Sequence, residues 1–196
     1  APSEEAIVAD KTCHPEYVAA DMLSQAEHGM DSQSILFTDN EDVARAVLAE
    51  VEKQLEALPR KEMASSSLGH SRIVVLHDME EAFEICNQYA PEHLILAMDT
   101  ALDWADRVVN AGSVFLGHYS CESAGDYASG TNHTLPTSGY AKAYSGVNLD
   151  SFCRKITFQH LTREGIESIG RAVEVMAEAE SLDAHRNAMT LRMKGR

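Results

Sequence analysis

Four short segments of the chain carry side chains that could bind a cation or transfer protons. In the first, SQAEHG, Gln25 and His28 stand three positions apart at the end of a predicted helix. Side chains at this spacing lie on one helix face, and an amide oxygen with an imidazole nitrogen suits zinc or a similar divalent ion. A helix that ends in His-Gly is more often an ordinary C-terminal turn, so these two residues alone leave both interpretations open.

The second segment, YAPEHLIL, places Glu92 and His93 between Pro91 and an apolar run. Pro91 should end the preceding helix, so the pair is expected on a turn that leads into a strand. A carboxylate beside an imidazole can abstract and relay protons near neutral pH. Working residues of open α/β sheets gather at the carboxyl ends of strands. The residues alone therefore favour a solvated turn with a hydrogen-bonded histidine.

The third segment, SCESAGDYASGTNHTLP (residues 120–136), is too polar and too rich in Gly and Ser to be core. We expect a loop, with Gly125 and Gly130 allowing tight bends. Asp126 could bind a metal and His133 could donate a hydrogen bond. A solvated connection without a ligand is the alternative.

The fourth segment, AEAESLDAHRNA, brings Glu180 and His185 near the junction of two predicted helices. A carboxylate and an imidazole there could form an ordinary helix-end interaction. Without further information, that interpretation is the simpler one.

The elements that must position these residues alternate between short apolar runs and helical patterns, with Asn40 and Asp78 as expected N-caps. This alternation predicts an α/β fold, namely an incomplete Rossmann-like α/β sandwich with a mostly parallel sheet. The expected strands are 6–9, 35–37, 73–76, 94–96 and 114–116, and the expected helices are 15–27, 41–58 and 79–89.

The last part of the chain has a different pattern. Residues 152–161 look strand-like, Thr162 is expected to cap a long helix, and a second helix should start near Asp183. We therefore divide the chain into an α/β part, residues 1–146, and a small helical tail, residues 147–196, that is expected to contact a neighbouring subunit.

Composition narrows the function classes. The 196 residues carry a formal net charge of −15, which would repel a nucleic-acid backbone. No apolar run approaches the length that crosses a bilayer, and no P-loop, dinucleotide-binding glycine motif or serine-hydrolase motif is present. Four scattered cysteines favour free thiols in a reducing cytoplasm. Cys121 and Cys153 could be nucleophiles for aldehyde chemistry, but sequence places no basic partner beside either.

Taken in order, DMLSQAEHG, QYAPEHLIL, NAGSVFLG, ESAGDYASGTNHTLPT and AHRNAMTLR resemble the histidinol dehydrogenase family and cover nearly the whole chain. The resemblance implies a cytoplasmic zinc enzyme of histidine biosynthesis. Such an enzyme oxidises L-histidinol to L-histidine with two NAD, through L-histidinaldehyde held on the protein.

The resemblance also implies residue roles. Glu92 and His93 would form the proton-transfer pair, with His93 taking the hydroxyl proton and Glu92 activating water. One zinc ligand would come from the other subunit of a homodimer through His185. The implied zinc ligands are Gln25, His28, Asp126 and His185. The implied substrate contacts are Ser3, Gln25, His28, His93, Asp126, Glu180 and His185.

The family's chain is roughly twice as long, and its amino-terminal part holds the residues that grip NAD. Because Pro2 and Ser3 run straight into a predicted strand, we expect this chain to be a fragment of a larger fold. The resemblance implies that, without the amino-terminal part, it does not bind NAD normally by itself. Cys121 stands where the family more often has Pro. Two alternatives stay open, namely a paralogous zinc and NAD dehydrogenase for another small hydroxylated substrate, such as sulfopropanediol, and an inactive truncated product. Retention of Glu180 favours histidinol.

Overall fold

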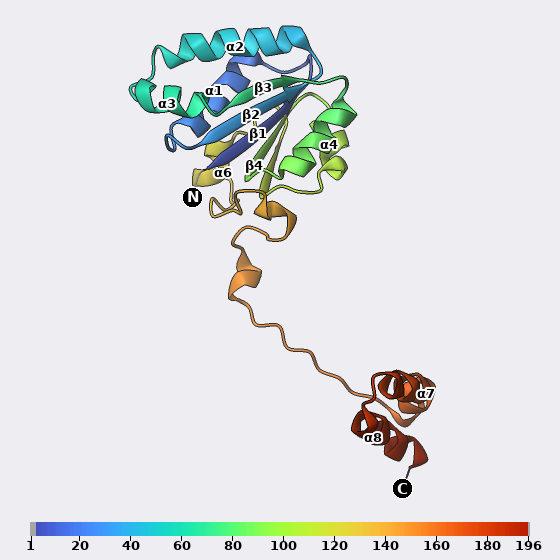
Figure 1. The fold of residues 1–196 in the computed structure, drawn as a ribbon. Helices are drawn as coiled ribbons and strands as arrows, with labels where there is room; N and C mark the ends of the chain where they lie inside the picture. The colour runs from blue at the N-terminus through green and yellow to red at the C-terminus, as the bar shows by residue number, and fades with distance from the viewer. Residues whose placement is uncertain (1–2, 196) are drawn as a thin grey trace. The chain divides into compact units, whose positions relative to one another are not determined.

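The computed structural model describes residues 3–195, so Pro2 lies outside the described residues. The chain forms two compact units that divide between Phe152 and Cys153. The first unit is an α/β sandwich and the second is a pair of helices (Figure 1).

The first unit is built on a five-stranded sheet in the order β3-β2-β1-β4-β5, and every strand pair is parallel. All five predicted strands are confirmed. The central strands are apolar without alternation from Ala6 to Ala9 in β1 and from Leu94 to Ala97 in β4, because helices cover both faces of the sheet. The strands are β1 (Glu4–Ala9), β2 (Gln33–Thr38), β3 (Arg72–Val75), β4 (His93–Ala97) and β5 (Ser113–Leu116).

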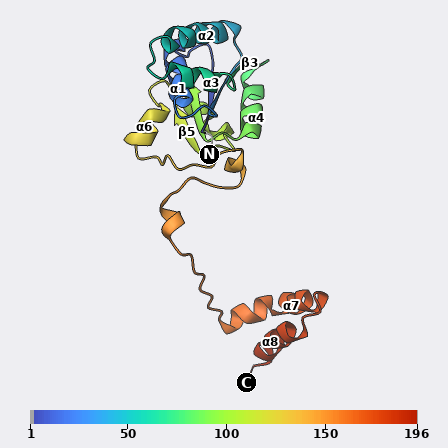
Figure 2. The same ribbon diagram turned by 60° about the vertical axis from the view of Figure 1, so that its left-hand side comes forward.

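Helices α1 (Pro15–Ala26), α2 (Glu41–Leu55) and α3 (Lys61–Leu68) lie on one side of the sheet, and α4 (Met79–Tyr89) lies on the other (Figures 1 and 2). Successive strand residues point to opposite faces. Ile7 therefore packs with the side chains of α1 and α2, whereas the next residue, Val8, packs with those of α4. The predicted Rossmann-like α/β architecture is confirmed.

Side-chain caps begin two of these helices as predicted. The Asn40 side chain accepts from the amides of Asp42 and Val43, and the Asp78 side chain accepts from the amide of Glu81. Caps of this kind contribute about 1 kcal/mol each. The end of α4 also agrees with the sequence, because the helix stops at Tyr89, just before Pro91.

The polar segment 120–136 departs from the expectation of a loop. A short helix, α6 (Glu122–Tyr127), forms within it. The helix sits close to β5 because Gly125 has no side chain, and a Cβ there would lie 2.5 Å from the Phe115 ring. The unit also contains α5 (Ala101–Trp104) and 3-10 turns at Ala105–Arg107, Tyr140–Lys142 and Leu149–Phe152.

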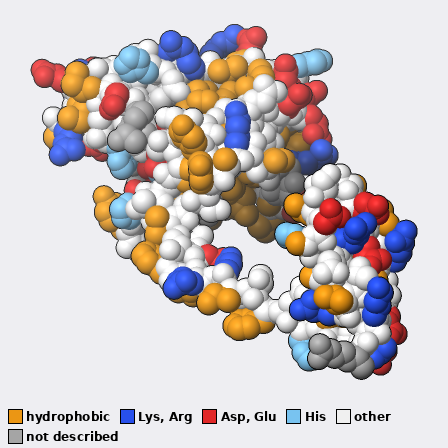
Figure 3. Space-filling view, turned by 60° about the horizontal axis from the view of Figure 1, so that its bottom comes forward, with side chains coloured by type: hydrophobic (Ala, Val, Ile, Leu, Met, Phe, Trp, Pro, Cys, Tyr) orange, Lys and Arg blue, Asp and Glu red, His pale blue; other side chains and the backbone are white. Residues whose placement is uncertain are grey.

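The second unit consists of α7 (Arg163–Ala179) and α8 (Asp183–Lys194). Thr162 caps α7 through the amide of Gly165, and α8 begins at Asp183, both as predicted. The strand-like prediction for 152–161 is wrong. Cys153–Leu161 has neither helix nor strand and pairs with no strand of the sheet, so Ile156 and Phe158 remain exposed at 64% and 93%. Figure 3 shows hydrophobic side chains on the surface among charged ones.

Among residues 3–195, no helix combines the length and the apolar character needed to cross a membrane.

Candidate active site

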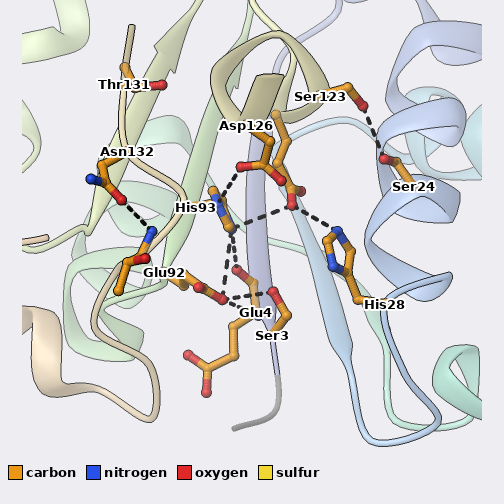
Figure 4. A network of polar contacts seen from close by, with 12 residues as sticks. Ser3, Glu4, Ser24, His28, Glu92, His93, Ser123, Asp126, Thr131 and Asn132 are labelled. Atoms are coloured by element: carbon orange, nitrogen blue, oxygen red, sulfur yellow. Dashed lines mark hydrogen bonds and ion pairs between the residues drawn. The ribbon is translucent and has the colours of Figure 1, made fainter. Parts of the chain in front are cut away.

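The candidate site lies at the amino ends of β1 and β4, which are neighbours in the sheet (Figure 4). Ser3 precedes β1, Glu92 precedes β4, and His93 is the first residue of β4. The side chains of Glu92 and His93 are only 8% and 3% exposed. The interpretation of this pair as a solvated turn is therefore wrong.

Glu92 is fixed from both sides. Its Oε2 accepts hydrogen bonds from the Ser3 hydroxyl at 2.8 Å and from the Glu4 amide at 3.0 Å. Its carbonyl accepts from the Ser113 amide at 2.9 Å, and a Cβ at Gly112 would come within 2.5 Å of the same carbonyl oxygen. The backbone of Glu92 is thus held beside the start of β5, and one oxygen of its carboxylate is bonded to two donors at the start of β1.

His93 sits between carboxylates. Its Nδ1 lies 3.4 Å from the Glu4 carbonyl oxygen, 3.6 Å from Glu122 Oε1 and 3.8 Å from Glu92 Oε2. Its Nε2 lies 3.8 Å from Asp126 Oδ1. The ring stacks on Phe115 with centroids 6.1 Å apart, so the imidazole is held by apolar contact as well as by charge.

Three side chains form a group that could hold a metal ion. One ligand atom each from His28, Glu122 and Asp126 lies within 4.8 Å of the others. His28 follows the end of α1, whereas the two carboxylates come from α6. A hydrogen bond of 3.2 Å between Ser24 and Ser123 ties the two helices together beside the group. The predicted pairing of His28 with Asp126 is therefore present.

Glu122 is the member that sequence reasoning missed. It stands four residues before Asp126, so both lie on one face of α6. The four-residue spacing of Glu122 and Asp126 becomes informative only once the segment is known to be helical. As a loop residue, a glutamate among serines and glycines looks solvated, yet Glu122 is 1% exposed.

Gln25 is buried on the last turn of α1, and neither its amide oxygen nor its amide nitrogen has a hydrogen-bond partner among the described residues. A buried polar group without a partner costs about 1–3 kcal/mol. Native proteins rarely tolerate that cost unless an ion, a water or a ligand completes the bonding. This orphaned amide fits a metal ligand at the predicted position.

Comparison with known proteins now decides the family. A profile described as histidinol dehydrogenase matches residues 1–193. The chain belongs to the histidinol dehydrogenase family. Histidinol dehydrogenase from Bacteroides thetaiotaomicron is 58% identical over 192 residues, which are 98% of this chain and 45% of that protein. The chloroplastic histidinol dehydrogenase of Oryza sativa subsp. japonica is 57% identical over 194 residues, which are 98% of this chain and 41% of that protein.

A solved structure agrees. The crystal structure of histidinol dehydrogenase from Elizabethkingia anophelis superposes with a TM-score of 0.92 at 58% identity and covers 99% of this chain and 45% of that one. The chain therefore spans less than half the length of the histidinol dehydrogenases that it matches.

The carboxylates behind the site make this part of the histidinol dehydrogenase fold strongly acidic. Glu5, fully buried on β1, accepts a hydrogen bond from the Ser34 hydroxyl at 2.8 Å, and burial raises its pKa well above the ordinary value, with the charge of Glu122 adding to the effect. Burial and then the charge of Glu122 raise the pKa of Asp21 to about 7.

The carboxylate of Glu122, whose Oε1 lies 3.4 Å from His28 Nε2, raises the pKa of His28 against an opposing effect of burial. Unbalanced negative charge of this kind favours a bound cation.

The remaining predicted residues lie elsewhere. His133 is exposed in the first unit. Glu180 ends α7 and His185 is exposed on α8, both in the second unit, so their roles stay predictions.

All four cysteines are free, as predicted. Burial raises the pKa of the Cys13 and Cys86 thiols to about 11 and about 12, which makes these two unsuitable as nucleophiles.

Proposed function

We propose that this chain supplies the zinc-binding, substrate-binding and proton-transfer residues of a histidinol dehydrogenase. The reaction is the oxidation of L-histidinol to L-histidine through L-histidinaldehyde, the last steps of histidine biosynthesis. The observation that carries the proposal is the buried His93, which lies between Glu92 and the group formed by His28, Glu122 and Asp126. Membership of the family supports it.

The donor types of the described residues fit zinc. Gln25, His28 and Asp126 offer an amide oxygen, an imidazole and a carboxylate without a thiolate, which is a set that divalent zinc accepts. We assign the fourth ligand to His185 of a second subunit in a homodimer. When bound, zinc supplies a charged template for the substrate while NAD accepts the hydride, because zinc itself does not change redox state. The residues that grip NAD are assigned to sequence outside this chain.

The chain's own residues handle protons and orientation. His93 takes the hydroxyl proton of histidinol at Nε2, since this nitrogen has no hydrogen-bond partner among the described residues. Glu92 activates the water that hydrates the aldehyde before the second oxidation, and the Ser3 hydroxyl holds Glu92 in place. Because His93 is almost fully buried, bulk water is kept from its ring.

Substrate recognition in this proposal uses Ser3 and His93 together with the metal-binding residues. Glu180 offers a carboxylate to a cationic part of the substrate, where a charge-assisted hydrogen bond is strong. We assign the enzyme to the cytoplasm, although the rice relative is named as chloroplastic.

The test compares the chain alone with a fusion to the amino-terminal part of the Bacteroides thetaiotaomicron relative. We expect both proteins to bind zinc and only the fusion to form NADH with histidinol. Turnover of sulfopropanediol with none of histidinol would favour a paralogous dehydrogenase. A fusion that binds zinc but oxidises neither alcohol would instead indicate an inactive fragment.

A further inference from the structure

We propose that Glu122 is a positioning residue that keeps the ring proton of His93 on Nδ1, so that Nε2 is the nitrogen that accepts the substrate proton. The inference deepens the proposed function and rests on it for the identity of the substrate. It concerns a residue outside the predicted ligand set and the predicted proton-transfer pair.

The surroundings of Nδ1 determine where the proton resides. Three oxygens face this nitrogen, from the Glu4 carbonyl at 3.4 Å, Glu122 at 3.6 Å and Glu92 at 3.8 Å. In a neutral imidazole one nitrogen donates and the other accepts. The hydrogen bond made by one nitrogen decides which tautomer is present. A nitrogen that faces only acceptors is the one that carries the proton.

Glu122 differs from the Glu92 carboxylate because its oxygens lack hydrogen-bond donors. The Glu92 oxygen near His93 already accepts from the Ser3 hydroxyl and the Glu4 amide. Both oxygens of Glu122 are buried, and neither makes a hydrogen bond of ordinary geometry within residues 3–195. A buried carboxylate in this state gains most from an N–H donor. The two imidazoles at hand are His93 through Nδ1 and His28 through Nε2, the latter 3.4 Å from the same oxygen.

The opposite side of the ring is left for chemistry. Nε2 of His93 is buried and has no hydrogen-bond partner among the described residues, and its nearest charged neighbour is Asp126 Oδ1 at 3.8 Å. Because Glu122 and Asp126 stand four residues apart on α6, one helical turn presents a carboxylate to each nitrogen of the same imidazole. The short helix thus orients the ring and directs its lone pair toward the candidate metal group (Figure 4).

The substitution Glu122→Gln tests this role because it keeps the shape of the side chain and adds an amide that can donate. A donor facing Nδ1 favours the tautomer with the proton on Nε2, as an Asp to Asn change does in a catalytic triad. Glu84→Gln is the matched control, since it makes the same chemical change at an exposed glutamate on α4, away from the candidate metal group. The probe is ¹⁵N-labelled histidine, with the His93 signal identified by its loss in His93→Asn.

In the unsubstituted 196-residue chain, we expect the ¹⁵N shifts of His93 to show a protonated Nδ1 and an unprotonated Nε2. In Glu122→Gln, the proton should move to Nε2 in a measurable fraction of molecules while zinc content stays unchanged. In the fusion, the single-turnover rate of the first oxidation should fall by about 10- to 1,000-fold, toward the loss seen when a triad histidine has the wrong tautomer. Glu84→Gln should change neither the shifts nor the rate by more than about twofold.

Three results would overturn the inference. The first is a proton on Nε2 in the unsubstituted chain, a result that needs no variant and therefore stands even if Glu122→Gln misfolds. The second is an unchanged tautomer in a folded Glu122→Gln protein. The third is loss of zinc from that variant, which would make Glu122 a metal ligand instead. A fusion that shows the expected tautomer but never oxidises histidinol would contradict the proposed function and leave the positioning role supported.

Discussion

Gly125 offers the sharpest test of how α6 builds the site, because an added methyl group has no space there. A Cβ at this position would lie 2.5 Å and 2.7 Å from two carbons of the Phe115 ring and 2.8 Å from the Thr131 hydroxyl oxygen. Phe115 is 6% exposed, belongs to the core and stacks on His93, so its ring cannot swing away freely. In Gly125→Ala, either the ring or α6 must therefore move.

The size of the effect follows from the overlap. Ordinary Cβ contacts lie at 3.4–4 Å, so relief of the 2.5 Å contact needs a shift of about 1 Å. Overpacking of this kind costs about 1–3 kcal/mol in the free energy of unfolding. For a chain of this length, the thermal midpoint should fall by about 2–10 °C. Since Glu122 and Asp126 flank Gly125 on the same helix, zinc affinity should fall about 10- to 100-fold, as it does when groups that orient metal ligands are disturbed.

The assay combines thermal unfolding with zinc titration against a competing chelator. Gly165→Ala is the control, because a Cβ there meets its nearest atom at an ordinary 3.5 Å. That variant should keep its zinc affinity and unfold at the same temperature or slightly higher. If Gly125→Ala has the midpoint and the zinc affinity of the unsubstituted chain, the close packing of α6 on Phe115 is not what positions the metal group.

Four further outcomes are expected. Burial raises the pKa of Asp21 to about 7 from 3.8, so between these pH values the folded state keeps a proton on Asp21 that the unfolded state has lost. The contribution of this group to the free energy of unfolding is therefore fully present below about pH 4 and is lost as the pH rises toward 7. Asp21→Asn should flatten this decline and stabilise the metal-free protein at pH 7.5 by roughly 1–4 kcal/mol. Denaturant unfolding at several pH values measures the effect, and an unchanged pH profile would contradict the raised pKa. His28→Asn should lower zinc affinity and activity together, and unchanged metal content would count against it as a ligand. His93→Asn should slow histidinol oxidation in the fusion while zinc stays bound, whereas loss of the metal would assign this residue a different role. Asn40→Ala should cost about 1 kcal/mol in urea unfolding without altering zinc affinity, and no loss would mean that the cap does not stabilise α2.

Much of the fold is readable from the sequence because its signals are local. The runs 6–9 and 94–96 are apolar without alternation, which is typical of strands buried on both faces. Asn40 and Asp78 precede helical patterns and do cap helices. The run 152–161 misled the prediction because alternating apolar residues favour a strand only where another strand is available to pair with it. No such partner lies beside Cys153–Leu161 among the described residues.

The site was less readable because its decisive features depend on contacts between distant segments. The residue types of Gln25, His28 and Asp126 by themselves predict metal binding only at weak specificity, and the family resemblance strengthened that prediction. The burial of Glu92 and His93 depends on β5 and α6, which come later in the chain, so no local pattern predicts it. Glu122 had no signal at all until α6 was known to be a helix.

The position of the site at the amino edge of the sheet has an electrostatic consequence. In a parallel α/β sandwich, each crossover helix begins near the carboxyl end of one strand and ends near the amino end of the next. The amino edge therefore receives helix C-termini, such as that of α1 beside Gln25 and His28 and that of α4 before Glu92. Unpaired carbonyl groups give these termini a partial negative charge of about half an elementary unit, which attracts cations and repels phosphate. This edge of the sheet is therefore electrostatically better suited to a cation than to a phosphate group.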